Sequence, residues 1–219
     1  MSIKKITWGL LLWGTAIPVS YSQRRLTEVT LVYTVSFEAV DTVAQLTFGT
    51  GGLKAYCYLK GANSRTDLVT RVGKQSTVFI TKPPQVLLLK EYGDQRYMTR
   101  LTTEQWEKSN QKYKEARYSF TSDSLRVQGY LCYRALATLP DSTQLKIWYT
   151  RELMPLNKEF LPMAEFIPGL ILSFESFWGD SRIRYDIDQI LFSPVQQALF
   201  DIPERGYRLL EQEGIRKEK

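Results

Sequence analysis

The segment TLVYTVSF, residues Thr30–Phe37, alternates along most of its length between large apolar and small polar side chains. One face of the segment carries the apolar set, namely Leu31, Tyr33, Val35 and Phe37. Successive side chains of a β-strand point to opposite faces of a sheet. The segment is therefore predicted to be a strand with one face buried in a core.

The same period of two recurs along most of the chain. Turn-forming residues such as Gly61, Gly73 and Pro83–Pro84 separate the alternating segments. A spacing of about ten residues between turn signals favours an antiparallel meander and a mainly β fold. The further predicted strands are Leu53–Leu59, Asn63–Thr70, Ser76–Thr81, Val86–Glu91, Arg96–Leu101, Leu125–Ala137, Gln144–Glu152, Leu170–Phe174 and Arg182–Phe192.

One helix is predicted to interrupt the strands, from Thr102 to about Ala116. Thr102 is suited to be its N-cap, and Gln105 three positions later completes a capping-box pattern. The apolar stripe of this helix is thin and consists of Trp106 and Tyr113. We therefore expect the helix to lie across the sheet with only these two side chains docked.

The N-terminal segment Met1–Ser22 has the layout of a secretory signal peptide. Two lysines precede an apolar run, Ile6–Val19, and small residues follow it. The run has about 14 residues, fewer than the ~20 that a membrane-spanning helix needs. Cleavage is predicted after Ser22, which exports a protein that begins near Gln23. The alternative interpretation is a membrane anchor.

The exported part is predicted to be one domain, residues 23–213, followed by a polar tail, residues 214–219. Its composition is that of a globular protein, since the whole chain is 43% hydrophobic and 24% charged. The net charge of +6 is a modest basic excess that can favour anionic lipid headgroups. Peripheral membrane contact is therefore one expectation, and charge that only keeps the protein soluble is the other.

The chain contains no histidine, which excludes Ser-His-Asp and Cys-His catalysis and histidine-based metal sites. Asp186 and Asp188 lie on one strand face with Arg182 and Arg184, where two carboxylates could act as acid and base or bind a cation. Alternating charges that stabilise a solvated face are the alternative. No order of aromatic and basic residues indicates nucleic-acid binding. We expect no enzymatic activity, cofactor or metal.

The chain has two cysteines, Cys57 and Cys132, which are too few for a metal site. Export would permit a disulfide between them. Both residues lie in predicted strands, so a Cys57–Cys132 bridge requires those strands to be close. Two buried free thiols are the alternative.

Four motifs follow one another in the C-terminal half: GYLCYRA (Gly129–Ala135), IWYT (Ile147–Thr150), FIPGLI (Phe166–Ile171) and LFDIPERGY (Leu199–Tyr207). In this order the motifs resemble the GLPGLI family of exported proteins. They equally resemble a neighbouring family of exported domains of unknown function. The resemblance covers most of the predicted mature chain.

This resemblance implies an architecture similar to the LolA/LppX lipoprotein-carrier superfamily. That architecture is a curved antiparallel half-barrel with one or two covering helices, and Ser193–Leu199 is predicted to form the second, short helix. The resemblance implies a protein of the periplasm or outer-membrane periphery that binds an apolar ligand, such as a lipid or a lipoprotein acyl chain, in its concave face. The expected lining is Leu31, Tyr33, Val35, Phe37, Trp106, Trp148, Leu170, Leu172 and Phe174.

A second interpretation assigns the aromatic side chains to core packing alone, because aromatic residues suit strands in any case. The protein would then be an interaction or scaffolding protein of the cell envelope or secretion machinery, with an envelope protein as its partner. This alternative predicts that the concave face contains no ligand cavity.

Overall fold

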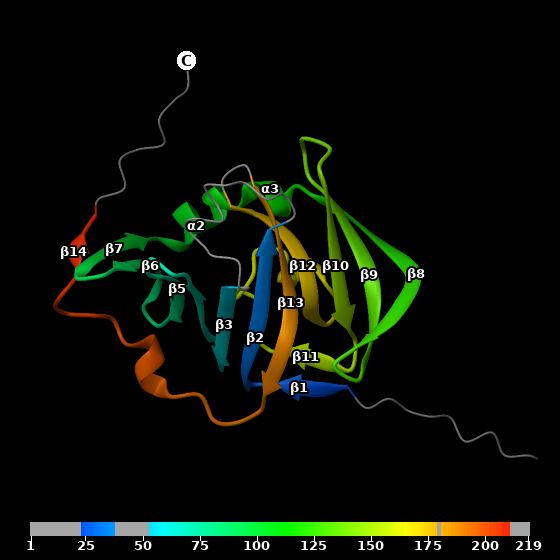
Figure 1. The fold of residues 1–219 in the computed structure, drawn as a ribbon, viewed down its shortest axis with the longest axis horizontal. Helices are drawn as coiled ribbons and strands as arrows, with labels where there is room; N and C mark the ends of the chain where they lie inside the picture. Colours follow the sequence, from blue (N-terminus) through cyan, green and yellow to red (C-terminus); the bar gives the residue numbers. More distant parts are fainter. Residues whose placement is uncertain (1–22, 38–52, 179–180, 211–219) are drawn as a thin grey trace, which may run out of the picture.

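The computed structural model describes residues 23–37, 53–178 and 181–210 (Figure 1). The predicted signal peptide and polar tail lie outside these residues. The elements, in chain order, are β1 (Arg24–Leu26), β2 (Glu28–Phe37), β3 (Leu53–Lys60), β4 (Asn63–Val69), β5 (Lys74–Thr81), β6 (Pro84–Tyr92), β7 (Gln95–Leu101), α2 (Thr103–Ser109), α3 (Gln111–Lys114), β8 (Arg117–Val127), β9 (Tyr130–Thr138), β10 (Gln144–Thr150), β11 (Leu153–Pro155), the 3-10 turn η1 (Ala164–Phe166), β12 (Leu170–Trp178), β13 (Ser181–Leu191), η2 (Gln197–Phe200) and β14 (Arg208–Leu209).

Two antiparallel meanders form one large sheet, with the strand order β14-β7-β6-β5-β4-β3-β2-β13-β12-β10-β9-β8. The first meander runs outward from β2 to β7, and the second runs inward from β8 to β13. The two meanders join where β2 pairs with β13, and Tyr33 lies opposite Ile187 in this pairing. The short strand β14 is parallel to β7, and β1 and β11 form a separate parallel pair.

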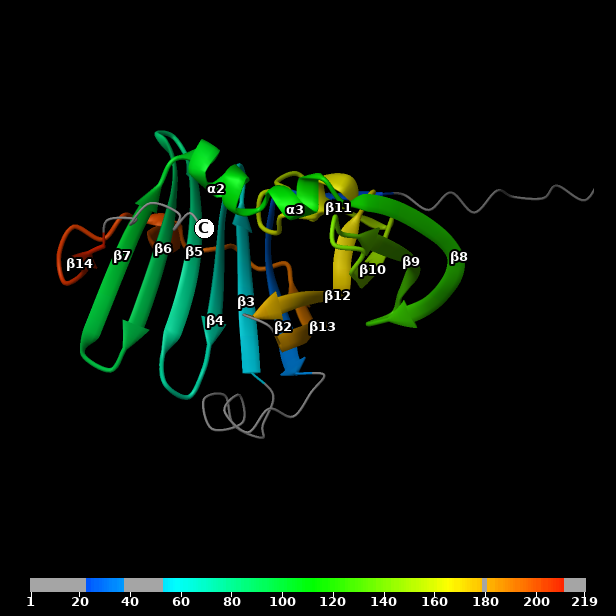
Figure 2. The ribbon, with the colours of Figure 1, turned by 90° about the horizontal axis from the view of Figure 1, so that it is seen from above.

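The helices connect the two meanders. Figure 2 shows α2 and α3 crossing from the side of β7 towards β8, which lies at the opposite edge of the sheet. The sheet stays open and does not close into a barrel. The prediction of a mainly β, curved antiparallel sheet with a small helical component is confirmed.

The predicted helix begins as expected and ends early. Thr102 Oγ1 accepts a hydrogen bond from the Gln105 amide, and Gln105 Oε1 accepts one from the Thr102 amide, which completes the capping box. The single helix predicted up to Ala116 is wrong, because Asn110 leaves helical geometry and separates α2 from α3. The Asn110 side chain caps the first piece by donating to the Trp106 carbonyl at 2.9 Å.

The single strand predicted for Leu125–Ala137 is also wrong. The chain reverses at Gln128 and Gly129, which have φ values of 49° and 85°, and the segment contributes to both strands of the β8–β9 hairpin. Most of β8 was not predicted, because it is an edge strand without a buried side chain and so shows no alternation of apolar and polar residues. The predicted short helix at Ser193–Leu199 is the later 3-10 turn η2.

The two faces of the sheet have different roles. We call the face that bears Tyr33, Ala55 and Phe174 the inner face, and it carries the largest core cluster, which spans both meanders. The opposite, outer face of β5–β7 is covered by the C-terminal segment, from which Val195 and Phe200 pack on the strands. The C-terminal segment that follows β13 therefore forms a second, smaller core with the outer face of these strands.

The turn before β12 requires glycine for a steric reason. A Cβ atom on Gly169 would lie 2.0 Å from the Thr150 carbonyl oxygen, which is far inside van der Waals contact. Thr150 is the register partner of Leu170 at the start of the β10–β12 pairing. The motif FIPGLI thus places two backbones against each other, and only a residue without Cβ permits that approach.

We predict that Gly169→Ala lowers the free energy of unfolding by about 3 kcal/mol, because backbone atoms must move to relieve the contact. The matched control is Gly61→Ala, where an added Cβ meets no atom within 4 Å and only the φ of +58° is unfavourable. The control should cost about 1 kcal/mol. Urea unfolding followed by circular dichroism measures both values, and equal losses would contradict the steric argument.

Candidate functional site

A cavity of about 320 Å³ lies on the inner face, where the two meanders join. Strands β2, β3, β4, β12 and β13 form its walls. Residues at the α2–α3 junction and from the segment 160–163 form its roof. The lining side chains are Tyr33, Ala55, Cys57, Thr66, Ser109, Asn110, Lys112, Tyr113, Phe160, Leu161, Pro162, Met163, Phe174, Ser176, Phe177 and Tyr185.

Three aromatic rings from three strands make one wall of the cavity. The rings of Phe174 and Tyr185 stack with centroids 4.4 Å apart. Tyr33 meets both edge-on, with centroid distances of 5.7 Å to Phe174 and 6.3 Å to Tyr185. Such stacked and edge-on arrangements are the favoured ones for aromatic pairs. The wall is therefore ordered by its own packing.

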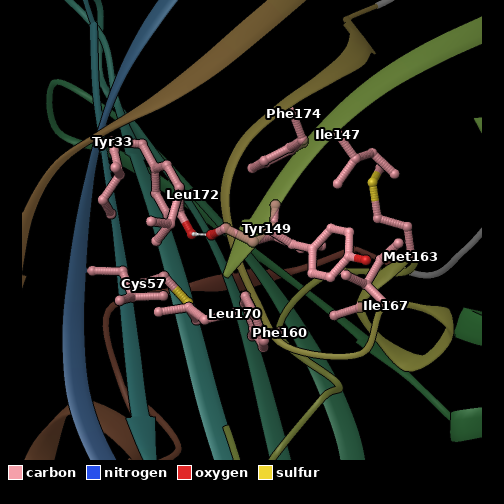
Figure 3. Packing of buried hydrophobic residues seen from close by; sticks show 14 of the residues in the cluster. Tyr33, Cys57, Ile147, Tyr149, Phe160, Met163, Ile167, Leu170, Leu172 and Phe174 are labelled. Atoms are coloured by element: carbon pink, nitrogen blue, oxygen red, sulfur yellow. Dashed lines mark hydrogen bonds between the residues drawn. The ribbon is translucent and has the colours of Figure 1, made fainter. Parts of the chain in front are cut away.

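The Tyr33 hydroxyl links β2 to β12, two strands of this wall that are separated by β13. It donates a 2.8 Å hydrogen bond to the carbonyl oxygen of Ile171, and the bond is buried (Figure 3). Burial raises the pKa of Tyr33 well above its ordinary value, and burial likewise raises the pKa of Tyr185. Both phenols are consequently neutral throughout the physiological pH range.

The helical part of the roof is tied to the walls by one side chain of the short helix α3. Tyr113 is buried, and its hydroxyl lies 3.2 Å from the Ser176 hydroxyl on β12. Tyr118 donates a 2.8 Å hydrogen bond to the Tyr113 carbonyl and so holds the end of α3. The prediction that Tyr113 docks on the sheet is confirmed, and it explains how so short a helix keeps its position.

The structure brings only part of the predicted lining to the cavity. Tyr33 and Phe174 border it. The expectation is wrong for the other predicted lining residues, because their side chains pack against neighbouring side chains and do not border the cavity. Four of them, namely Leu31, Val35, Leu170 and Leu172, are buried in the filled core. The remaining three are partly buried and pack elsewhere: Phe37 and Trp148 against this core, and Trp106 edge-on to Phe79.

Sequence reasoning missed most of the residues that form the cavity. Tyr185 shares a strand face with Ile183 and Ile187, so its alternation was visible, but nothing local distinguished it from a core residue. Phe160 and Met163 lie in an irregular, proline-containing stretch with no periodicity. A cavity forms where side chains from distant segments leave a space unfilled. No pattern within a single segment predicts where that happens.

The two strand carboxylates face away from the cavity. Asp186 accepts from Ser173 Oγ at 2.7 Å and is paired with Arg184 at 2.9 Å, and Asp188 is paired with Lys54 at 2.8 Å. These contacts cross three strand boundaries on the outer face. The arrangement agrees with alternating charges that stabilise a half-exposed surface.

The Cys57–Cys132 disulfide does not form. Both cysteines are buried and free, and their strands β3 and β9 are separated in the sheet by β2, β13, β12 and β10. Among the described residues, no group of three or more histidine, cysteine, aspartate or glutamate side chains is placed to hold a metal ion. The same part of the chain contains no helix of the length and apolarity needed to cross a membrane.

We predict that both thiols resist modification in the folded protein. Burial raises the pKa of Cys57 to about 12 and that of Cys132 to about 11. At pH 8 almost no thiolate is therefore present, and the thiolate is the form that reacts. Ellman's reagent should titrate no thiol at pH 8 in buffer and two in 6 M guanidinium chloride without reductant. No reaction in denaturant would mean that a disulfide exists.

Comparisons with known proteins bear on the fold alone. No family model matches the chain, and no curated protein matches it. An uncharacterized conserved protein from Thermus thermophilus has a similar structure, with a TM-score of 0.51, 9% identity, and coverage of 85% of this chain and 92% of that one. Two crystal forms of PNGF-II give TM-scores of 0.49 and 0.47 at 13% identity, and the chain spans only 31% and 32% of their length.

Proposed function

We propose that this protein is a non-enzymatic binding protein that holds an apolar or amphipathic ligand, such as a lipid or an acyl chain, in the cavity on its inner face. The observation that carries the proposal is the cavity itself, which opens beside the filled core of the inner face. Its volume of about 320 Å³ falls in the range of about 300–1,000 Å³ that is typical of ligand sites.

The lining supports an amphipathic ligand. Aromatic and aliphatic side chains make up most of the lining, and polar groups along the walls and the rim come from Thr66, Ser109, Asn110, Lys112 and Ser176. Protein interiors are close-packed, with few voids larger than a water molecule. A space of this size beside three ordered aromatic rings, open at the rim where Lys112 is exposed, is therefore a candidate ligand site.

The proposed place of action is outside the cytoplasm, in the periplasm or at the outer-membrane periphery. The support is the N-terminal pattern of two lysines, an apolar run and small residues before Gln23. We expect the intact mass of the protein recovered from the periplasm of its own cells to correspond to a chain that begins at Gln23. Recovery of the full-length chain in membranes would instead support the membrane-anchor interpretation.

The ligand is tested by native mass spectrometry and by a neutral fluorescent probe, 1-aminoanthracene. We expect the wild-type protein to carry a bound small molecule that is released on denaturation, and to bind the probe. Ser176→Phe and Ala55→Leu place bulk in the cavity and should each weaken probe binding about tenfold or more, because the apolar contact area is lost.

The matched control is Ser36→Phe, which introduces the same side chain at an exposed position of β2. It should leave probe binding unchanged, and thermal unfolding shows whether each variant is folded. A wild-type protein that carries no ligand and binds no probe would overturn the proposal. That result would favour the interaction protein of the envelope and direct the search to partner pull-downs.

A further inference from the structure

The cavity has a marked charge asymmetry. Lys112 is the one charged residue among the described side chains that line it, and no aspartate or glutamate belongs to the lining. The walls otherwise present neutral groups, including the hydroxyls of Thr66, Ser176 and Tyr185. The lining of the cavity therefore presents one positive charge and no negative charge.

Lys112 stands at the rim, beside two rings that also line the cavity. Its Nζ lies 5.2 Å from the ring centroid of Tyr113 and 5.7 Å from that of Phe177. An ammonium group within about 6 Å of an aromatic ring is attracted to the ring face. The contact holds the charge at the mouth of the cavity, while the residue itself stays exposed to solvent.

Lys112 forms no salt bridge with the described residues. Within the described residues Lys112 has no carboxylate partner at salt-bridge distance, whereas Lys114, on the same short helix, pairs with Glu107 at 2.9 Å. Hydrogen bonds from Thr143 lower the pKa of Asp141 most, and the more distant charge of Lys112 contributes least. An ammonium group without a paired carboxylate, at the rim of a carboxylate-free cavity, is placed to receive an anion.

A second polar group on the wall is also available. The Tyr185 hydroxyl makes no hydrogen bond within the described part of the chain, whereas the Tyr33 hydroxyl is used by the Ile171 carbonyl. Burial keeps Tyr185 protonated by raising its pKa, so it can donate a hydrogen bond to an oxygen atom of a ligand. Lys112 and Tyr185 both favour ligand groups that accept hydrogen bonds.

We propose that the cavity selects an amphiphile with an apolar or aromatic body and a single anionic group of the carboxylate type. The body lies against Tyr33, Phe174 and Tyr185, and the anionic group lies at the rim beside Lys112. This inference rests on the proposed function, because it assigns polarity and orientation to the same ligand site.

The test compares three ligands that share a twelve-carbon chain and differ in charge. Dodecanoate is an anion, dodecanol is neutral and dodecyltrimethylammonium is a cation. All are used at pH 7.5, the two ions below their micellar concentrations and the alcohol below its solubility limit. Isothermal titration of the protein lacking residues 1–22 should give the tightest binding for dodecanoate. The cation should bind more weakly than the alcohol, because Lys112 repels it.

Lys112→Gln should weaken dodecanoate binding about fivefold, the size expected for one partly exposed charge contact, and leave dodecanol binding unchanged. Lys112→Glu should reverse the preference, so that the cation binds better than the anion. The matched control is Lys108→Gln on α2, which removes the same net charge from an exposed residue outside the cavity lining. It should change none of the three affinities.

The outcomes separate the two proposals. If no twelve-carbon ligand binds the wild-type protein and 1-aminoanthracene does not bind either, the proposed function fails. If the alcohol and the anion bind equally, or if Lys112→Gln weakens both to the same extent, the cavity is a ligand site without the proposed charge selection. If Lys108→Gln has the same effect as Lys112→Gln, the preference arises from net charge and not from the rim.

Discussion

The pairing of β2 with β13 is the contact on which the whole structure depends. Each meander forms from strands that are close in sequence, but β2 and β13 are separated by most of the domain. Their pairing runs from Phe37 opposite Ile183 to Thr30 opposite Leu191. Bringing such distant segments together has a loop-closure cost, which the backbone pairing and the side-chain contacts at this junction offset.

Several interactions reinforce the junction on both faces of the sheet. On the outer face, Lys54 of β3 reaches across β2 to Asp188 of β13 and also donates to Thr34. On the inner face, the Tyr33 ring packs on Phe174 and Tyr185 and its hydroxyl reaches the backbone of β12. The same aromatic residues that join the meanders also make one wall of the cavity, so the proposed site lies at the junction of the two meanders.

The helical part of the roof is held by few buried contacts. Helices α2 and α3 are short, and Tyr113 is the one residue in either of them that is buried. Regions with few buried apolar contacts open at lower free energy than the core. The proposed site therefore has walls of paired strands and a roof whose helical part has Tyr113 as its one buried residue.

Local patterns predicted the parts of the fold that depend on local physics. The alternation of apolar and polar residues predicted β2 to β7, and the capping box predicted the start of α2. Both signals depend only on residues that are neighbours in the sequence. Local patterns failed at β8, which lies at the sheet edge and has little to bury, and at Asn110, whose side chain ends α2. The order of the four C-terminal motifs singles out FIPGLI in the sequence. The close approach of Gly169 to Thr150 follows only from the pairing of β10 with β12.

The sequence by itself determined that the chain is a mainly β antiparallel protein, that histidine chemistry is excluded, and that the N-terminus resembles an export signal. These properties follow from composition and from periodicity within single segments. Only the tertiary structure decided that Cys57 and Cys132 lie on separated strands, and that Leu31 and Leu172 fill the core while Tyr185 and Lys112 face a cavity. The physical reason is that burial, pairing and empty space arise between segments, where each side chain's environment is supplied by residues far away in the sequence.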